Sequence, residues 1–477
     1  MAPARRRCRG HDVRGWAFLS EQPRRSDGGT ARQGCAAVTA ATAHGVDHIV
    51  IAGMAVEAPG GIDSPGSFWS ALAASKELLG PFPRDRGWPI DELLSLSRLD
   101  DWGTVCDAGG FIDNAAEFDP AFFWISPREA IATDPQQRVA LRVAWRALEN
   151  TGLNPGALAG EDAGCFIGCS PTEYGPPGAE VNEYNGVRVI GYGLLSVAGR
   201  VSHGLGLTGP SMTVDAACAS SLTAVHLAAA AVRDGDCEWA LAGAVCVMGA
   251  PGVFYEFAKH NALSNDGHCR SYSDDATGTL WGEGAGIVIV ERESRARRLG
   301  HRIHGRLLAS HHNHNGKGKP ILVPRTDAQE RLIRKTIAKS GIDPADVGMI
   351  EGHGTATRAG DPVELRALQN TYGAAGSAPL LGSVKSNAGH AQAAAGMLGL
   401  IKLLLAGRHG QIPATLFADN PTTRVDWDRS SLRLATELQP WEPKNGMRYG
   451  AVSSFGAAGS NAHAILEMPV REENDDV

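Results

Sequence analysis

Short apolar runs that alternate with helical segments are the feature of this sequence that most limits its fold. The first is HIVIAGMAV (48–56), a β-branched run closed by a Pro-Gly-Gly turn. Runs of this kind indicate buried strands. Further runs lie at 164–169, 211–217, 239–248 and 285–292. Because helical segments lie between them, the pattern predicts a largely parallel sheet covered by helices.

A second series of apolar runs lies toward the C-terminus. These candidate strands occupy 303–310, 347–353, 378–386 and 450–456. Helical stretches such as 326–340 and 391–406 separate them. We therefore expect two α/β halves that divide near residue 300, at 47–300 and 301–468, each with its own sheet.

Composition and charge exclude several classes of protein. Hydrophobic residues make up 43% of the chain and charged residues 20%, which is typical of a globular α/β protein. The net charge of -7 and the lack of a basic face beyond the N-terminus argue against nucleic acid as the principal partner. No window reaches the roughly 18 consecutive apolar residues of a membrane helix. We expect no membrane span.

The nine cysteines are scattered and include no CxxC pair. This pattern predicts reduced thiols and a cytoplasmic location. Cys165 and Cys169, in AGCFIGCS, fit packed small side chains better than half of a metal site.

The two ends differ in composition from the rest. Residues 1–46 are rich in arginine and lack the apolar segment of a secretory signal, so we expect a basic, disordered extension. An organelle transit peptide and an extended start of the reading frame are the alternatives. Residues 469–477 end in REENDDV and are expected to form a solvated acidic tail.

The segment VDAACASSLTAVHLA (214–228) contains the first candidate for chemistry. A strand-like run leads into Cys218, and a helix rich in alanine and leucine follows. The free amides and positive dipole at a helix N-terminus favour the reactive thiolate, and a sharp turn exposes the sulfur to a thioester. A buried structural cysteine is the alternative.

Two further segments contain histidines in a similar setting. EGHGTATRAGDPVE (351–364) places His353 in a Gly/Thr loop directly after a predicted strand. GSVKSNAGHAQAAAG (382–396) places Lys385 and His390 on a strand-to-helix turn like that of Cys218. Either histidine alone could be structural. Together with Cys218 they predict one catalytic site.

These three segments resemble the Cys-His-His signature of β-ketoacyl synthases of the modular polyketide type. The resemblance runs from about residue 48 to 468. It includes GPFPRDRGW (80–88), DPQQRVAL (134–141), WGEGAG (281–286) and SSFGAAGSNAH (453–463). It implies the thiolase fold, in which two similar α/β halves form an αβαβα layered sandwich, and decarboxylative Claisen condensation as the reaction.

The resemblance also implies roles for the three residues. Cys218 would accept an acyl group from the phosphopantetheine of a carrier protein. His353 and His390 would stabilise the enolate that forms when malonyl-carrier loses CO2. The backbone amides of Cys218 and Ala457 would form the oxyanion hole.

Other residues match supporting positions of the family. Lys385 and Glu364, which could pair with each other, would organise His390 and the local charge. Thr355, Thr357 and Phe455 would contact the pantetheine arm or substrate, although loop capping is an alternative for the threonines. The resemblance implies no metal and no cofactor bound by the chain itself.

The sequence departs from the family pattern at three places. Ala216 replaces a common threonine, which we assign to packing. Ala457 stands where many relatives have Phe or Ile, which predicts a roomier acyl site. In HHNHNGKGKPILVPR (311–325), Asn315 replaces an aspartate and basic residues are added. A solvated loop, a loop that meets phosphate or an acidic carrier, and a histidine metal site are the readings of that segment.

Within the family, GPFPRDRGW and CVMGAPGVFYEFAKHNALSNDGHCRSYS (246–273) are most similar to stand-alone ketosynthases of mycobactin- and nocobactin-type siderophore assembly. That similarity implies carrier proteins supplied in trans, and the fold implies a homodimer. The alternatives are a non-catalytic chain-length factor, a thiolase and a Cys-His hydrolase. Intact Cys218, His353 and His390 favour the condensing enzyme over a chain-length factor.

Overall fold

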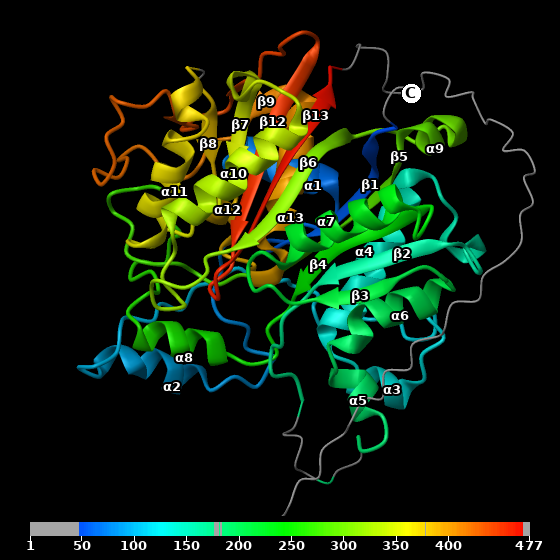
Figure 1. The fold of residues 1–477 in the computed structure, drawn as a ribbon. Coiled ribbons are helices and arrows are strands. Elements are labelled where there is room, and N and C mark those ends of the chain that lie inside the picture. Colours follow the sequence, from blue (N-terminus) through cyan, green and yellow to red (C-terminus); the bar gives the residue numbers. More distant parts are fainter. Residues whose placement is uncertain (1–46, 176–180, 182–183, 377, 471–477) are drawn as a thin grey trace, which may run out of the picture. The chain divides into compact units, whose positions relative to one another are not determined.

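The computed structural model describes residues 47–175, 181, 184–376 and 378–470 (Figure 1). Eleven of its strands form one hydrogen-bonded sheet. Their order is β10-β8-β7-β12-β13-β6-β1-β5-β4-β2-β3. The strands are β1 (Ile49–Glu57), β2 (Ala163–Gly168), β3 (Ser211–Val214), β4 (Trp239–Cys246), β5 (Gly284–Arg292), β6 (Gly305–His314), β7 (Val347–Glu351), β8 (Leu380–Gly382), β10 (Arg433–Leu434), β12 (Met447–Phe455) and β13 (Ser460–Pro469). A small second sheet pairs β9 (Gln411–Ile412) with β11 (Gln439–Pro440).

The strand order repeats within the large sheet. The N-terminal strands run β3-β2-β4-β5-β1, and the C-terminal strands run β8-β7-β12-β13-β6 in the corresponding order. In each set the fourth strand is antiparallel to both neighbours. The prediction of two similar α/β halves is confirmed.

The two sets of strands join into one sheet where β1 pairs with β6 through Val50 and Ile51. This short pairing joins the two expected sheets along one edge, so they are not separate. The prediction that they are largely parallel is wrong, because half of the pairings are antiparallel. Apolar runs identify strands but not their direction or their partners. Strand β13 was not predicted; it returns from β12 through a tight turn at Gly456–Gly459.

Two helices lie between the halves. Helix α7 (Ser220–Asp234) contacts β2 and β4 on one side and β6 on the other, while α13 (Ala395–His409) contacts both β5 and β12. Outside them, α4 (Pro135–Thr151) covers β1 and β5, and α10 (Thr326–Ser340) covers β6 and β13. The N-terminal strands and the C-terminal strands of the joined sheet therefore lie in two layers, which gives the expected helix–sheet–helix–sheet–helix sandwich.

The remaining helices border these layers. They are α1 (Pro65–Ala73), α2 (Ile90–Ser95), α3 (Pro127–Ala132), α5 (Arg188–Tyr192), α6 (Leu195–Leu205), α8 (Gly252–Lys259), α9 (Glu293–Leu299), α11 (Gly360–Gln369) and α12 (Lys385–Ala388). Single 3-10 turns occupy Leu96–Arg98, Pro155–Ala157, Pro344–Asp346, Gly373–Ala375 and Gln392–Ala394. The predicted helix at 326–340 coincides with α10.

The described part of the chain has no helix that is both long and apolar enough to cross a membrane. The described residues form one compact unit, so the boundary near residue 300 stays a prediction. The predicted N-terminal extension and most of the acidic tail lie outside the described residues.

Candidate active site

Three segments that are far apart in the sequence meet at the predicted site. Cys218 lies between β3 and α7, His353 follows β7, and His390 lies between α12 and α13. The sulfur of Cys218 and one ring nitrogen of each histidine lie within 4.8 Å of one another. The two imidazole rings are 5.4 Å apart and nearly perpendicular, at 89°.

A sharp turn carries Cys218 from β3 into α7. Ala217 has a φ of 50°, a left-handed conformation that is uncommon for a residue with a Cβ atom. Ser220 holds the turn, because its hydroxyl accepts from the Ala216 amide at 2.8 Å and donates to the Ala217 carbonyl at 2.6 Å. The Ser454 hydroxyl donates to the carbonyl of Cys218 at 2.5 Å. The turn is as sharp as the sequence predicted.

The environment of the thiol differs from the prediction. Cys218 is only 9% exposed, and burial raises its pKa to about 11, while the Lys385 ammonium and the amides of Ala457 and Cys218 lower it. Desolvation therefore outweighs the helix N-terminus, and the resting sulfur is a protonated thiol. Both predicted oxyanion-hole amides donate to this sulfur. They therefore lie close enough to donate to the carbonyl oxygen of an acyl group on Cys218.

The ring of His390 is held in one orientation. Its Nδ1 accepts from the Gln392 amide at 3.1 Å, which leaves Nε2 as the protonated nitrogen of the neutral ring. The ring packs against Trp281 with centroids 5.0 Å apart. Its backbone amide donates to the Leu280 carbonyl at 2.7 Å.

Both histidines are neutral at physiological pH. Burial, and next the charge of Lys385, lower the pKa of each imidazole well below its usual range. Nδ1 of His353 is buried and has no hydrogen-bond partner among the described residues. An unpaired buried nitrogen of this kind can serve an incoming polar group.

Glu364 holds the loop of His353 in place. Its carboxylate accepts from the amides of His353 at 2.6 Å and Gly354 at 2.8 Å, and from the Tyr272 hydroxyl at 3.0 Å. The expected pair with Lys385 is not among the ion pairs of the described residues, because backbone and tyrosine donors occupy this carboxylate. Glu364 therefore organises the His353 loop, whereas the sequence analysis had assigned it to His390.

Lys385 is buried at the start of α12. Burial lowers the pKa of its ammonium, and the charges of Glu351 and then Glu364 raise it. Lys385 also acts on Cys218 and on both histidines. It is the positive charge that all three residues of the cluster share.

The three predicted substrate contacts lie beside His353. The Phe455 ring, at the end of β12, is 5.5 Å from the His353 ring. The hydroxyls of Thr355 and Thr357 are 3.0 Å apart, and Thr357 accepts from the Gly360 amide at 3.0 Å. Thr357 thus holds the first amide of α11, and its contact with substrate stays a prediction.

Comparison with known proteins agrees with this geometry. The N-terminal domain model of the β-ketoacyl synthases matches residues 46–296, and the C-terminal domain model matches residues 304–419. The chain belongs to the β-ketoacyl synthase family. Its relatives include polyketide synthase GfsA of Streptomyces halstedii, 45% identical over 89% of this chain and 6% of that protein. The pikromycin polyketide synthase component PikAII of Streptomyces venezuelae is 44% identical over 90% of this chain and 12% of that protein.

Solved structures give the same result. The oxazolomycin ketosynthase domain of Streptomyces albus superposes with a TM-score of 0.83 at 38% identity, over 89% of this chain and 75% of that one. A ketosynthase from module 6 of the Bacillus subtilis bacillaene synthase gives 0.81 at 33% identity, over 89% of this chain and 73% of that one. The synthase described here is thus similar to ketosynthase domains of polyketide synthases, and it spans a small share of its curated relatives' length.

Two family motifs meet in a buried ion pair that the sequence analysis missed. Arg86, from GPFPRDRGW, forms an ion pair with Glu283, from WGEGAG. Glu283 is fully buried and also accepts from the amides of Ile112 at 2.9 Å and Met248 at 2.7 Å. The sequence feature that could have indicated this pair is Glu283 itself, the one carboxylate in the glycine-rich run WGEGAG. The pair holds the segment whose Trp281 ring packs against His390.

A second missed ion pair lies behind the site. Nζ of Lys402, in α13, is 2.8 Å from Oε2 of Glu351, at the end of β7. Both side chains are buried. The signal was a single lysine within LGLIKLLLAG, an otherwise apolar helix.

Within the described residues, Cys218, His353 and His390 form the one cluster whose donor atoms are close enough to share a cation. One thiolate and two imidazoles suit zinc. The raised pKa of Cys218 opposes metal binding, since only the thiolate is a good ligand. Cys165 and Cys169 are buried in the core, as predicted, and every cysteine of the described residues is free.

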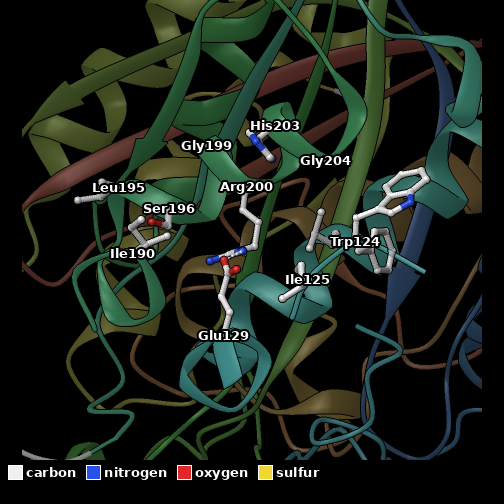
Figure 2. Close-up of a pocket in the computed structure, with 12 residues that line it drawn as sticks. Trp124, Ile125, Glu129, Ile190, Leu195, Ser196, Gly199, Arg200, His203 and Gly204 are labelled. Carbon is white, nitrogen blue, oxygen red and sulfur yellow. Dashed lines mark hydrogen bonds and ion pairs between the residues drawn. The ribbon is translucent and has the colours of Figure 1, made fainter. Parts of the chain in front are cut away.

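A cavity of about 440 Å³ lies apart from the cluster (Figure 2). Arg200 and Glu129, which both line it, form an ion pair of 2.7 Å. Its lining is mostly apolar and includes Trp124, Ile125, Ile190 and Leu195, with no residue of the Cys218 cluster.

Proposed function

We propose that this synthase extends an acyl chain by decarboxylative Claisen condensation, which makes it an acyltransferase of polyketide or hybrid peptide-polyketide biosynthesis. The observation that carries the proposal is the approach of the Cys218 sulfur and two histidine nitrogens within 4.8 Å. A nucleophile for the acyl group and two neutral donors for an enolate then share one buried site.

In the loading step, Cys218 attacks the thioester carbonyl of an acyl-carrier. Because its pKa is about 11, the thiol must lose its proton on demand, and a neutral imidazole within reach can accept it. The S–C bond forms, and the amides of Cys218 and Ala457 stabilise the oxyanion. Collapse of the intermediate breaks the bond to the carrier sulfur, which leaves with the proton.

In the condensation step, the histidines act on malonyl-carrier. Loss of CO2 places negative charge on the malonyl thioester oxygen, where Nε2–H of His390 and an N–H of His353 stabilise it. The enolate carbon then attacks the acyl carbonyl on Cys218. The new C–C bond forms, the C–S bond breaks, and the sulfur leaves to be reprotonated.

The supporting residues act through these three. Lys385 supplies positive charge beside Cys218, and Glu364 fixes the loop of His353. Thr355, Thr357 and Phe455 line the approach of the pantetheine arm. The reaction needs no metal and no cofactor other than the phosphopantetheine that carries the substrates.

The test is intact-protein mass spectrometry with acyl-carriers, followed by malonyl-carrier. We expect an acyl adduct on Cys218 that turns over only when malonyl-carrier is added, and no adduct on Cys218→Ala. A chain-length factor would form no adduct. A hydrolase would lose the adduct to water, and a thiolase would extend it without malonyl-carrier; either result contradicts the proposal.

Carrier proteins supplied in trans would bind at the basic loop within residues 311–325. The loop starts next to the oxyanion turn, since His314 donates to the Ala458 carbonyl at 2.9 Å and Asn315 donates to Gly459 at 2.9 Å. Lys317 and Lys319 are exposed there and have no ion pair among the described residues, and Ile321 is 67% exposed. We expect Lys317→Glu/Lys319→Glu to slow loading from acyl-carrier while loading from a small acyl thioester stays unchanged.

A second copy of the chain would cover the bare edge of the sheet. In the C-terminal half β8 is covered by β10, but its counterpart β3 has no neighbouring strand beyond it among the described residues. Met212, on β3 itself, and Leu195, on the helix α6 that packs against β3, are exposed apolar side chains. Open edges and apolar patches of this kind favour association. We expect a homodimer by light scattering, and a lower mass for Met212→Lys.

Three finer assignments rest on the sequence. The resemblance to mycobactin- and nocobactin-type enzymes supports a siderophore assembly line as the setting, and the free cysteines support a cytoplasmic location. The chain would divide into an extension at 1–46, halves at 47–300 and 301–468, and a tail at 469–477.

A further inference from the structure

The ion pair between Glu351 and Lys402 lies among the segments that carry the site. Glu351 is 1% exposed and Lys402 is fully buried. Buried charges are costly unless they are paired, so this pair needs both members. Neither residue belongs to the Cys218 cluster, and nothing in the chemistry of condensation requires a charge at this position.

One carboxylate connects the supports of three functional residues. Glu351 ends β7 two residues before His353, and its Oε1 accepts from the Val384 amide at 2.6 Å. Val384 directly precedes Lys385. The partner of Oε2 is Lys402, on the helix that follows His390. The carboxylate thus joins the His353 strand, the Lys385 turn and the His390 helix.

Close packing prevents the pair from shifting. A Cβ atom at Gly399 would lie 2.9 Å from Cγ of Glu351. A Cβ atom at Gly382 would lie 3.3 Å from Nζ of Lys402 and 2.8 Å from the Thr415 hydroxyl. Both glycines leave only the space that the pair occupies, so its geometry is fixed by its surroundings.

We propose that Glu351 and Lys402 are positioning residues of the site: the pair fixes the Lys385 turn against the His353 strand, and the Glu351 charge keeps the Lys385 ammonium in place beside Cys218. This inference rests on the proposed function of the cluster. It assigns neither residue a direct part in the reaction.

The electrostatics agree with this geometry. Among the charges that raise the pKa of Lys385 against burial, Glu351 has the largest effect. Lys385 in turn lowers the pKa of Cys218. The other titratable groups that interact with Lys385 are Glu364, Cys218, Cys269, His353, Asp361 and His390. Loss of the Glu351 charge is therefore expected to lower the pKa of Lys385. A Lys385 that is less fully protonated then lowers the pKa of Cys218 less, so that pKa rises.

The test uses the double variant Glu351→Gln/Lys402→Met, which leaves no unpaired buried charge. The first measurement is the rate of Cys218 alkylation against pH, followed by peptide mass spectrometry. We expect the midpoint to rise by about one pH unit, which lowers the rate about tenfold below the midpoint. The second is condensation, for which we expect kcat to fall at least about tenfold in protein that melts cooperatively.

The matched control is Glu291→Gln/Arg295→Met, which removes another buried pair, on β5 and α9. We expect it to keep the alkylation midpoint and the condensation rate of the wild type. Val384→Pro is a second variant, because Val384 has a φ of -60°, which proline adopts. It removes the hydrogen bond to Glu351 but leaves the ion pair, so condensation should fall while the alkylation midpoint stays.

The outcomes separate this inference from the proposed function. The inference is wrong if the double variant folds and if it and Val384→Pro both alkylate and condense like the wild type. The pair then only stabilises the fold. If the double variant does not fold, wild-type condensation by Val384→Pro overturns the positioning role by itself. Alkylation needs no condensation, so a wild type that alkylates normally but never condenses contradicts the proposed function instead.

Discussion

At the residue scale, the tautomer of His390 depends on one backbone contact. The Gln392 amide occupies Nδ1, so the proton that serves the substrate lies on Nε2. Gln392 itself has a φ of 47°, a left-handed conformation that is uncommon for a residue with a Cβ atom. A side chain that replaces Nε2 by another donor should therefore retain part of the activity.

We predict that His390→Gln decarboxylates malonyl-carrier faster than His390→Asn. The glutamine amide nitrogen reaches the position of Nε2, whereas the asparagine amide nitrogen reaches only that of Nδ1. His390→Asn should lose about 10²–10³ in rate, as expected when an oxyanion donor is removed. The measurement is release of labelled CO2. Equal rates for the two variants would show that Nε2 is not the donor.

Ala457 offers a second test at this scale. Its side chain is exposed on the turn that also supplies an oxyanion amide. We predict that Ala457→Phe slows loading of long or branched acyl groups about tenfold and leaves acetyl loading unchanged, because a large ring narrows the acyl site. Ala458→Phe, on the neighbouring exposed residue, is the control. A variant that keeps its full rate with branched donors contradicts the roomier acyl site.

The sequence predicted side chains better than contacts at this scale. Cys218, His353 and His390 were found because each follows a strand-like run in a similar turn. Gln392 was missed, because a backbone amide leaves no mark in residue type. The thiolate prediction failed for a related reason: burial depends on tertiary packing, and packing decides the pKa of Cys218.

At the element scale, a histidine links α7 to β6. Nδ1 of His226 is 2.9 Å from the Ser310 hydroxyl, and burial lowers the pKa of His226 to about 4. The titratable groups that lower its pKa further come from β6 (His311, His312), α10 (Lys339) and α7 (Arg233). The ring is neutral in the folded protein at every pH above about 4.

This arrangement predicts a contribution of His226 to acid lability. The unfolded histidine takes up a proton near pH 6.5 and the folded one only near pH 4, so stability is lost as the pH falls through this window. Between pH 7.5 and 5.0, Tm should fall about 2–4 °C less for His226→Asn than for wild type. Asparagine can keep the bond to Ser310 without titrating. Equal falls in Tm, measured by differential scanning fluorimetry, would show that His226 does not contribute.

Strands were easier to predict than their pairing. The run at 48–56 is β1 almost residue for residue, but its neighbours β5 and β6 begin more than 200 residues later. Local sequence carries no information about such distant partners. The helix at 326–340 was predicted fully, because its apolar positions follow the helical period and Gly341 ends it.

At the scale of the whole molecule, the two similar halves share their interior. Helix α7, from the N-terminal half, packs on β6 and β13 of the other half, and α13 packs on β5. Every residue of α13 from Ala395 to Gly407 is buried, which leaves this helix no solvent-facing side. Neither half could cover it alone. The two halves therefore repeat the same arrangement of strands, but neither is expected to be stable without the other.

We predict that residues 47–300 and 301–470, expressed separately, do not fold cooperatively, whereas the whole chain unfolds in one transition. Separation would expose the faces of α13 and α7 that pack on the other half. The free energy lost would exceed the marginal stability of a domain. It would also remove the pairing of β1 with β6.

The measurement is denaturant unfolding followed by circular dichroism and tryptophan fluorescence. Coincident curves for the whole chain support one cooperative unit, because probes from both halves then report the same event. A cooperative transition in either isolated half would show that its own sheet suffices, and the boundary near residue 300 would then be a true domain boundary.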